Sequence, residues 1–294
     1  MGFFDKFKKL FASNPDAGIP IIDLNKRFEL IGRTGQGSMS KVWRARDRET
    51  GRTVCVKVLD REKTIKFEAR FFGLKKPSEG TICMLLKHEN IVQTYEHGLT
   101  TEKEPYIMME LVDGVGFNFL IETKHKDLQG NRINYLKQYA LGIEYMHKTG
   151  FLHRDICPRN VMVNKEGVVK IIDLGLAIPY KPEFCRPGNR TGTTMYLAPE
   201  LIKRSTTDHR VDMFALGVTA FELFVGDFPW EKGNSQEVLR AIVNQAPRNA
   251  RDLRPDLPDD VVKFLMKGIE RDPNLRFQNP VEFRTALAQL AGES

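Results

Sequence analysis

The sequence HRDICPRNVMVNKEGVVKIIDLG, residues 153–175, constrains the fold more than any other stretch of the chain. Within it, VMVNKEGVVKII predicts a strand, a turn at residues 164–167 and a second strand, which together form a hairpin. Because a hairpin of this length brings its outer ends together, we expect Asp155, Asn160 and Asp173 to converge at one end of a small sheet. Two carboxylates and an amide there would supply oxygen ligands for magnesium, and one carboxylate could sit beside an incoming hydroxyl. Any one of these residues alone is commonly a solvated loop residue, but all three at this spacing favour a site.

The residues that precede this hairpin predict a helix. Apolar side chains stand at positions 133, 136, 140, 143 and 146, which is the pattern of one amphipathic helix. Gly150 is the natural end of that helix, because glycine adopts the left-handed conformation of a C-terminal cap.

The first third of the chain instead predicts strands. They cover residues 28–31, 41–46 and 53–59, with turn-forming residues between them. Residues 77–92 then predict a helix with Pro77 in its first turn. The segment PYIMMELVDG, which begins at Pro105, predicts a buried strand that runs into a glycine-bearing connector between two lobes.

Composition limits the class of protein. The chain has 294 residues, 41% hydrophobic and 28% charged, as in ordinary globular domains. Its formal net charge of +7 favours anionic partners such as nucleotides, acidic proteins or a membrane surface, and we expect no nucleic-acid partner. The four cysteines show no metal-like pairing and no signal peptide precedes them, which predicts a cytoplasmic protein. No run of eighteen apolar residues suggests a bilayer span.

Residues 1–12, MGFFDKFKKLFA, predict a short basic amphipathic helix. Such a helix could lie on an anionic membrane surface or dock on a partner, and it could equally pack on its own domain. Lys6 stands where a myristoylation signal requires serine or threonine, so a lipid on Gly2 is not expected. Residues 13–20 are rich in turn formers and predict a linker.

Two features of the strand region are ambiguous by themselves. Gly35 and Gly37 lie in a loop between two strands, where glycine lets backbone amides approach phosphate closely, although two glycines are more often a simple turn. Lys57 lies among apolar neighbours in the third strand, where a buried ammonium needs an anion. The alternative is an edge-strand lysine that points to water.

Taken in order, these motifs resemble those of a eukaryotic-type serine/threonine protein kinase over about residues 27 to 290, and the predicted basic N-terminal helix resembles bacterial members of that family. The resemblance rests on the glycine loop, VCVK, HENIV, MEL, HRDICPRN, DLG, GTTMYLAPE, DMFALGV and DPNLR. Each motif is weak alone, but their order and spacing are specific. The resemblance implies an α+β bilobal fold, with an antiparallel sheet plus one helix in the N-lobe and a mainly helical C-lobe. The expected division is residues 1–25 for the helix and linker, 26–112 for the N-lobe and 113–294 for the C-lobe.

The resemblance also implies roles for individual residues. Those assigned to ATP are Gly35, Gly37, Val42, Lys57, Glu79, Met109, Glu110 and Val112. Glu79 is the expected partner of Lys57, with Glu68 as the alternative. Asp155 would orient the substrate hydroxyl and accept its proton, while Asn160 and Asp173 would hold Mg²⁺. The residues assigned to structural support are Glu200, which would pair with Arg276, and Asp212, which would brace the catalytic loop.

Cys157 is the main departure from the family pattern. Serine/threonine kinases carry at that position a lysine that brings positive charge near the transferring phosphoryl group, and a thiol cannot replace it. Arg159, two residues later, occupies a position at which receptor-type tyrosine kinases carry arginine, so we expect it to deliver the same charge. Ser40 in the glycine loop and Leu174 after Asp173 are departures that remove no ligand.

The segment after Asp173 predicts the acceptor and the regulation. Thr193 matches the threonine that in serine/threonine kinases reaches the catalytic aspartate, so we assign it a catalytic role and expect serine or threonine acceptors. Arg154 suggests control by loop phosphorylation, with Thr191 as the first expected phosphosite and Thr194 as the second. Cys185 is expected to be an exposed thiol.

The predicted function is transfer of the ATP γ-phosphate to serine or threonine hydroxyls of proteins, including the chain itself. Two alternatives remain open at this stage, a nucleotide-binding pseudokinase that acts as a scaffold and a small-molecule kinase. The sequence does not indicate the oligomeric state.

Overall fold

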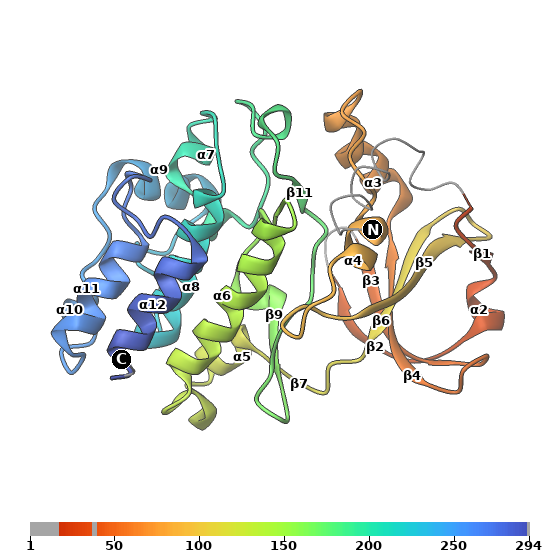
Figure 1. Cartoon of the computed structure of the whole chain (residues 1–294), viewed down its shortest axis with the longest axis horizontal. Helices are drawn as coiled ribbons and strands as arrows, with labels where there is room; N and C mark the ends of the chain where they lie inside the picture. The colour runs from red at the N-terminus through yellow and green to blue at the C-terminus, as the bar shows by residue number, and fades with distance from the viewer. Residues whose placement is uncertain (1–17, 37–39, 293–294) are drawn as a thin grey trace. The chain divides into compact units, whose positions relative to one another are not determined.

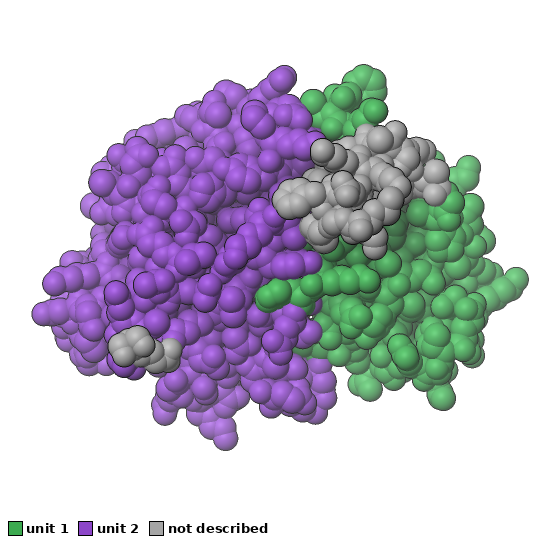
Figure 2. Space-filling view, in the orientation of Figure 1, with its two compact units in different colours: residues 1–88, 92–112 green, residues 89–91, 113–294 purple. Residues whose placement is uncertain are grey.

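The structure, a computed structural model, describes residues 18–36 and 40–292. The predicted helix of residues 1–12 and Gly37 lie outside the described residues. The chain divides into two compact units, one of residues 1–88 with 92–112, the other of residues 89–91 with 113–294 (Figure 2). Residues 89–91 therefore cluster with the second unit, whereas the sequence analysis placed them with the first.

The first unit contains one six-stranded sheet in the order β1-β5-β6-β4-β3-β2 (Figure 1). Its strands are β1 (Ile21–Ile22), β2 (Phe28–Gln36), β3 (Ser40–Asp47), β4 (Thr53–Leu59), β5 (Thr94–Thr100) and β6 (Pro105–Glu110). All neighbours are antiparallel except β1, which pairs with β5 in parallel. The three early strands and the strand from Pro105 are thus present as predicted, and β1 and β5 are additions.

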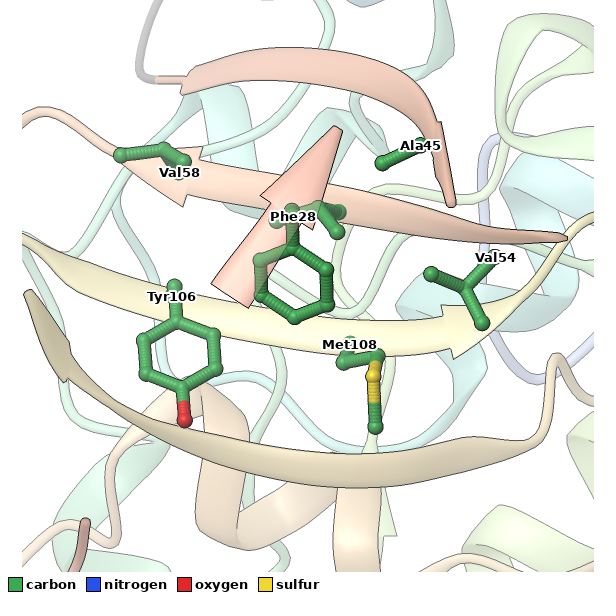
Figure 3. Packing of buried hydrophobic residues seen from close by; sticks show 7 residues of the cluster. Phe28, Ala45, Val54, Val58, Tyr106 and Met108 are labelled. Atoms are coloured by element: carbon green, nitrogen blue, oxygen red, sulfur yellow. The ribbon is translucent and has the colours of Figure 1, made fainter. Parts of the chain in front are cut away.

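The core of this unit covers one part of the sheet. Its buried residues are Phe28, Ala45, Val54, Val56, Val58, Tyr106 and Met108 (Figure 3). The rings of Phe28 and Tyr106 meet edge to face, with centroids 6.4 Å apart. Val54, Val56 and Val58 alternate along β4, which is the period of two that puts every second side chain on one face.

The described part of this unit contains more helix than the single one expected. Its helices are α2 (Leu24–Arg27), α3 (Arg61–Glu68), the 3₁₀ turn η1 (Ala69–Phe71) and α4 (Glu79–Leu85). Periodicity does not reveal α3 because Phe67 is its only buried residue, and the helix starts where Asp60 accepts a hydrogen bond from the Lys63 N–H. Ser78 caps α4, so Pro77 precedes this helix and does not lie in its first turn.

Helix α4 lies tightly against β5. A Cβ atom added to Gly80 would lie 2.6 Å from side-chain atoms of His97, so only glycine fits at this contact.

The second unit is mainly helical (Figure 1). Its helices are α5 (Phe117–Glu122), α6 (Arg132–Lys148), α7 (Pro199–Ile202), α8 (Arg210–Val225), α9 (Ser235–Asn244), α10 (Ala250–Leu253), α11 (Asp259–Gly268) and α12 (Pro280–Leu290). Its 3₁₀ turns are η2 (Lys126–Leu128), η3 (Pro158–Asn160), η4 (Pro182–Phe184) and η5 (Thr194–Tyr196). The predicted amphipathic helix is α6, and Gly150 follows its cap with φ +81° as expected.

This unit also contains short strands, two of which form the predicted hairpin. The strands are β7 (Gly114–Gly116), β8 (Phe151–Leu152), β9 (Val161–Asn164), β10 (Val169–Ile171) and β11 (Ile178–Pro179). Strands β9 and β10 pair antiparallel, with Ile171 opposite Val161, as the sequence predicts, and β7 pairs with β9 on the other side.

Helix α8 forms the centre of the helical unit. It is buried along nearly its whole length and ends at Gly226, which has φ +81°. Gly217 of this helix lies directly against Gly268 of α11, because a Cβ atom on Gly217 would fall 2.1 Å from the Gly268 carbonyl oxygen. Across residues 18–36 and 40–292, no helix combines the length and the hydrophobicity that a bilayer span requires.

Candidate active site

Asp212 of α8 fixes the backbone of residues 153–155, which we call the HRD segment. Its two carboxylate oxygens accept hydrogen bonds from the N–H groups of His153 and Arg154, both at 2.9 Å. His147 Nε2 lies 2.8 Å from the same carboxylate. Burial acts to raise the pKa of Asp212, but the hydrogen bond with His147 and the one from the Arg154 N–H help to bring that pKa below its ordinary value. Asp212 therefore stays ionised and positions the start of the loop.

The Asp155 carboxylate is held from two sides. Its Oδ1 accepts hydrogen bonds from the backbone N–H and the hydroxyl of Thr193, at 2.7 and 2.8 Å. Its Oδ2 accepts one from Asn160 Nδ2 at 2.9 Å, and the same amide donates to the Asp155 carbonyl at 2.8 Å. The structure thus brings together three of the predicted site residues around one carboxylate.

Asp173 lies at the same end of the β9–β10 hairpin as Asn160. The N–H of Ile172 donates to the Asn160 carbonyl at 3.0 Å, so Asp173 is the residue immediately beyond that pair. The Asp173 Oδ1 accepts a hydrogen bond from the Gly175 N–H at 2.8 Å.

These two residues provide a donor set that suits Mg²⁺. Asn160 uses its Nδ2 to bind Asp155, and among the described residues no hydrogen bond reaches its Oδ1. An amide oxygen and a carboxylate are the hard oxygen ligands that Mg²⁺ takes, together with water and substrate phosphates.

Cys157 is a buried neutral thiol. Its side chain is 1% exposed, and its Sγ lies 3.9 Å from the Thr193 hydroxyl. Burial and the nearby Asp155 raise the pKa of Cys157 to about 12. This residue therefore carries neither the positive charge of a lysine nor the negative charge of a thiolate at neutral pH.

Arg159 is exposed on η3, directly before Asn160. It forms no ion pair with any residue in the described ranges. Burial raises the pKa values of Tyr196 and Glu222, and the charge of Arg159 opposes both shifts. Tyr196 donates to Glu222 Oε2 at 2.6 Å, and burial raises the pKa of Glu222 to about 7 in spite of that bond.

The guanidinium of Arg154 is already engaged. It is 4% exposed and donates to the Thr207 hydroxyl at 3.2 Å and to the Asn189 carbonyl at 2.7 Å. Asn189 lies two residues before Thr191, and both Thr191 and Thr194 are half-buried. The loop thus binds Arg154 through its own backbone, and the roles of the two threonines as phosphosites stay predictions.

The expectation for Cys185 is wrong. Its side chain is 3% exposed, and its carbonyl accepts a hydrogen bond from the Thr207 N–H at 3.0 Å. Burial raises the pKa of the Cys185 thiol.

In the sheet unit, Lys57 pairs with Glu79. Lys57 is 5% exposed, and its Nζ lies 2.6 Å from Glu79 Oε1. Glu79 is the first residue of α4, whose start is fixed by the Ser78 cap. A buried ammonium ion requires such a partner, because its desolvation is costly. Glu68, the alternative, is the last residue of α3.

Three residues assigned to ATP lie in line across three strands. Gly35 of β2 is opposite Val42 of β3, and Val42 is opposite Lys57 of β4. Gly37 lies outside the described residues.

The remaining residues assigned to the nucleotide are on β6 or follow it. Met109 is 6% exposed and lies opposite Cys55. The N–H of Glu110 donates to the Gln93 carbonyl at 2.8 Å, so this N–H is already used within the sheet unit. Val112 lies beyond the strand.

Arg276 is a buried anchor of the helical unit. It pairs with Glu200 through two hydrogen bonds of 2.9 and 2.8 Å, as expected. Its other N–H groups donate to the carbonyls of Glu270, Arg210 and Arg271. All five donors of this guanidinium are therefore satisfied.

Sequence reasoning missed two interactions in this unit. One is the contact of His147, a residue of the predicted amphipathic helix, with Asp212. The other is the hydrogen bond from Tyr196 to Glu222. Both depend on contacts between segments far apart in the chain, for which a single sequence gives no local signal.

Comparisons with known proteins show the family of the chain. The family model described as "Protein kinase domain" matches residues 28–287. The chain belongs to the protein kinase family. This result confirms the fold class and the resemblance to serine/threonine kinases that the motifs predicted.

Individual kinases show the same relationship. The chain is 32% identical over 269 residues to a probable serine/threonine-protein kinase of Clostridium perfringens. This alignment covers 91% of the present chain and 38% of the relative. It is 31% identical over 279 residues to the serine/threonine-protein kinase PknB of Mycolicibacterium smegmatis, with 91% and 43% covered. It is 33% identical over 242 residues to an Aurora kinase of Saccharomyces cerevisiae, with 81% and 64% covered. The chain thus spans about two fifths of the length of these bacterial relatives.

Proposed function

We propose that the chain transfers the γ-phosphate of ATP to serine or threonine hydroxyls of proteins, itself among them. The observation that supports this most is the state of the Asp155 carboxylate. A carboxylate has about four lone-pair sites, and three are occupied, by the Thr193 N–H, the Thr193 hydroxyl and Asn160 Nδ2. The remaining site on Oδ2 is available to a substrate hydroxyl, which Asp155 would orient and whose proton it would accept.

The other assigned residues would hold and neutralise the nucleotide. Lys57, paired with Glu79, would contact the α and β phosphates. Asn160 and Asp173 would hold Mg²⁺, which supplies charge neutralisation to the phosphates when bound. Val42 and Met109 would contact the adenine from β3 and β6.

The residues that would contact the nucleotide through their own backbone are Gly35, Gly37, Glu110 and Val112. For Glu110 only the carbonyl can serve this purpose, because its N–H already donates to Gln93. Thr193 would link Asp155 to the segment that receives the substrate, which favours serine and threonine acceptors.

We further propose that Arg159 supplies the positive charge that Cys157 lacks. The high pKa of Cys157 supports this by excluding a harmful thiolate. The second candidate, a nucleotide-binding pseudokinase, is favoured by the same residue, because a neutral thiol also provides no compensating charge. A small-molecule kinase is disfavoured by the Thr193 contact to Asp155.

Radiolabelled ATP tests these functions. The purified chain is incubated with Mg-ATP and a generic protein substrate, and phosphate incorporation into the substrate and into the chain is measured beside Asp155→Asn. We expect transfer by the parent chain and its loss in the variant. Nucleotide binding without transfer would establish the pseudokinase. Phosphorylation of an aminoglycoside or choline, and of no protein, would establish a small-molecule kinase.

Two further variants separate Arg159 from Cys157. We expect Arg159→Ala to lower kcat about 100-fold, as loss of an electrostatic donor does, and Cys157→Lys to restore part of that loss in the double variant. An unchanged rate in Arg159→Ala would refute the relocation of the charge.

Location and partners are also proposals. We propose a cytoplasmic protein whose residues 1–12 bind an anionic membrane surface or a partner protein. Thr191 and Thr194 are the proposed sites of phosphorylation. Mass spectrometry of the chain after incubation with ATP tests both positions.

A further inference from the structure

The segment between β4 and α4 is strongly basic. Residues 61–76 contain six lysines and arginines against two glutamates. They form α3 and η1 and then a short connector. Apart from Glu68, the alternative partner of Lys57, none of these residues is assigned to catalysis or to ATP.

Two phenylalanines fasten this segment to the unit. Phe67 and Phe71 are buried, and their rings meet edge to face with centroids 5.5 Å apart. The Lys76 ammonium lies 5.4 Å from the Phe67 ring centre and 6.0 Å from that of Phe71. The base of the connector is therefore fixed.

A third phenylalanine points into water. Phe72 is 95% exposed, although it follows the buried Phe71 directly. The Leu74 N–H donates to the Phe71 carbonyl at 2.9 Å, which closes a turn with Phe72 and Gly73 at its centre. Phe72 has φ −52° and ψ 131°, and Gly73 has φ +79°. These are the angles of a type II turn, whose third position requires glycine. The turn thus holds Phe72 outward by its backbone geometry.

Basic residues precede and follow Phe72 in the sequence, and their side chains are exposed. Lys66, Arg70 and Lys75 are all exposed, and Ile65 of α3 is 57% exposed. We call Phe72 with these three basic residues the α3 tip. The Arg70 guanidinium lies 5.8 Å from the Phe67 ring centre. An exposed apolar ring with exposed basic side chains within six residues of it matches a membrane interface, where the ring enters the headgroup layer and the cations meet lipid phosphates.

We propose that the α3 tip docks on an anionic lipid membrane. Phe72 inserts among the headgroups, and Lys66, Arg70 and Lys75 bind the lipid phosphates. The positive charge of the tip selects an anionic surface, and the single protruding ring suits a soft layer that closes around it. The α3 tip includes none of residues 1–12, and the proposal does not depend on the proposed phosphotransfer.

Tryptophan fluorescence tests insertion at the tip directly. F72W and the control I31W are made in the full chain, because Ile31 is also an exposed apolar residue, at 54%. Each variant is mixed with vesicles of phosphatidylcholine alone or with one quarter phosphatidylglycerol. With vesicles that contain phosphatidylglycerol, we expect the emission of F72W to shift to shorter wavelength and to be quenched by brominated lipids. With phosphatidylcholine alone, we expect neither change. I31W is expected to change in neither case.

Vesicle flotation measures the contribution to affinity. F72S should weaken binding about tenfold, from the apolar surface that Phe72 buries. K66Q/R70Q/K75Q should weaken it about 100-fold or more at low salt, since each cation near an anionic surface contributes about fivefold. I31S should bind as the parent does. Repeating the series with F3S/F7S separates the tip from residues 1–12, and the tenfold factor for F72S should persist there.

Three outcomes would overturn the proposal. The first is a parent chain that does not float with anionic vesicles. The second is an equal affinity for F72S and I31S. The third is an F72W emission shift that polyglutamate produces and vesicles do not, which would make the tip a site for an acidic protein.

Discussion

Glu200→Gln should destabilise the helical unit by about 3 kcal/mol. Arg276 is 1% exposed, and two of its five N–H donors bind the Glu200 carboxylate. The glutamine keeps one acceptor oxygen but turns an NH₂ group toward a guanidinium and removes the compensating charge. Removing one partner of a buried ion pair typically costs about 3–5 kcal/mol. We take the lower end, because the three carbonyl acceptors of Arg276 remain.

Urea denaturation followed by tryptophan fluorescence measures this effect. The chain contains two tryptophans, of which Trp230 lies buried in the helical unit. A Trp43→Phe background leaves Trp230 as the reporter of that unit. With a slope of about 2 kcal/mol per molar urea, the expected loss lowers the midpoint by about 1.5 M.

The matched control is Asp256→Asn, which leaves the hydrogen bond from Arg254 to the Phe224 carbonyl in place. Arg254 pairs with Asp256 at 2.7 Å, but the two side chains are 36% and 66% exposed. An exposed pair contributes about 0–1 kcal/mol, so this midpoint should move by less than 0.5 M or so. Equal shifts in both variants would show that burial of the Arg276 pair has no energetic weight, and the reasoning would be wrong.

Three other predictions follow from single contacts. Gly217→Ala should destabilise the same unit by about 2–3 kcal/mol or more in urea, because the new methyl group meets the Gly268 carbonyl and the packed helices must separate; an unchanged midpoint would contradict this contact. Glu222→Gln should flatten the pH dependence of stability, since the Glu222 pKa is near 7 in the folded chain and near 4.5 when unfolded. Between these two pH values the folded state binds one proton more than the unfolded state. The free energy of unfolding of the parent therefore falls by about 3 kcal/mol as pH rises from 4.5 to above 7. Denaturation at pH 5 and at pH 8 checks whether the variant lacks this fall. Glu79→Gln should lower kcat for peptide phosphorylation, because the buried Lys57 loses its carboxylate, whereas Glu68→Gln should not.

The sequence predicted the parts of the site that depend on local pattern. The turn between β9 and β10 and the helix that ends at Gly150 both have strong local signals, and they place Asn160, Asp173 and the start of the HRD segment. The pairing of Lys57 with Glu79 followed from motif spacing in the kinase resemblance, although the two residues are far apart in the chain.

Features that depend on distant segments were not predictable in the same way. Cys185 is buried, and its carbonyl accepts a hydrogen bond from the Thr207 N–H, which lies far beyond it in the chain. Arg154 binds the Asn189 carbonyl, and a backbone acceptor has no signature in the sequence. Phe72 shows the opposite case, since hydrophobicity predicts a buried ring while the backbone of one turn keeps it exposed.

The close contact of Gly80 with His97 has a consequence for measurement. An imidazole ring this near would perturb the magnetic shielding of the Gly80 α-protons, so their NMR resonances should be displaced from ordinary glycine values. Glu79, which binds Lys57, is the neighbouring residue in the chain. Any ligand or sequence change that moves this short helix would alter those resonances, and a single glycine signal would then report the state of the lysine–glutamate pair in solution.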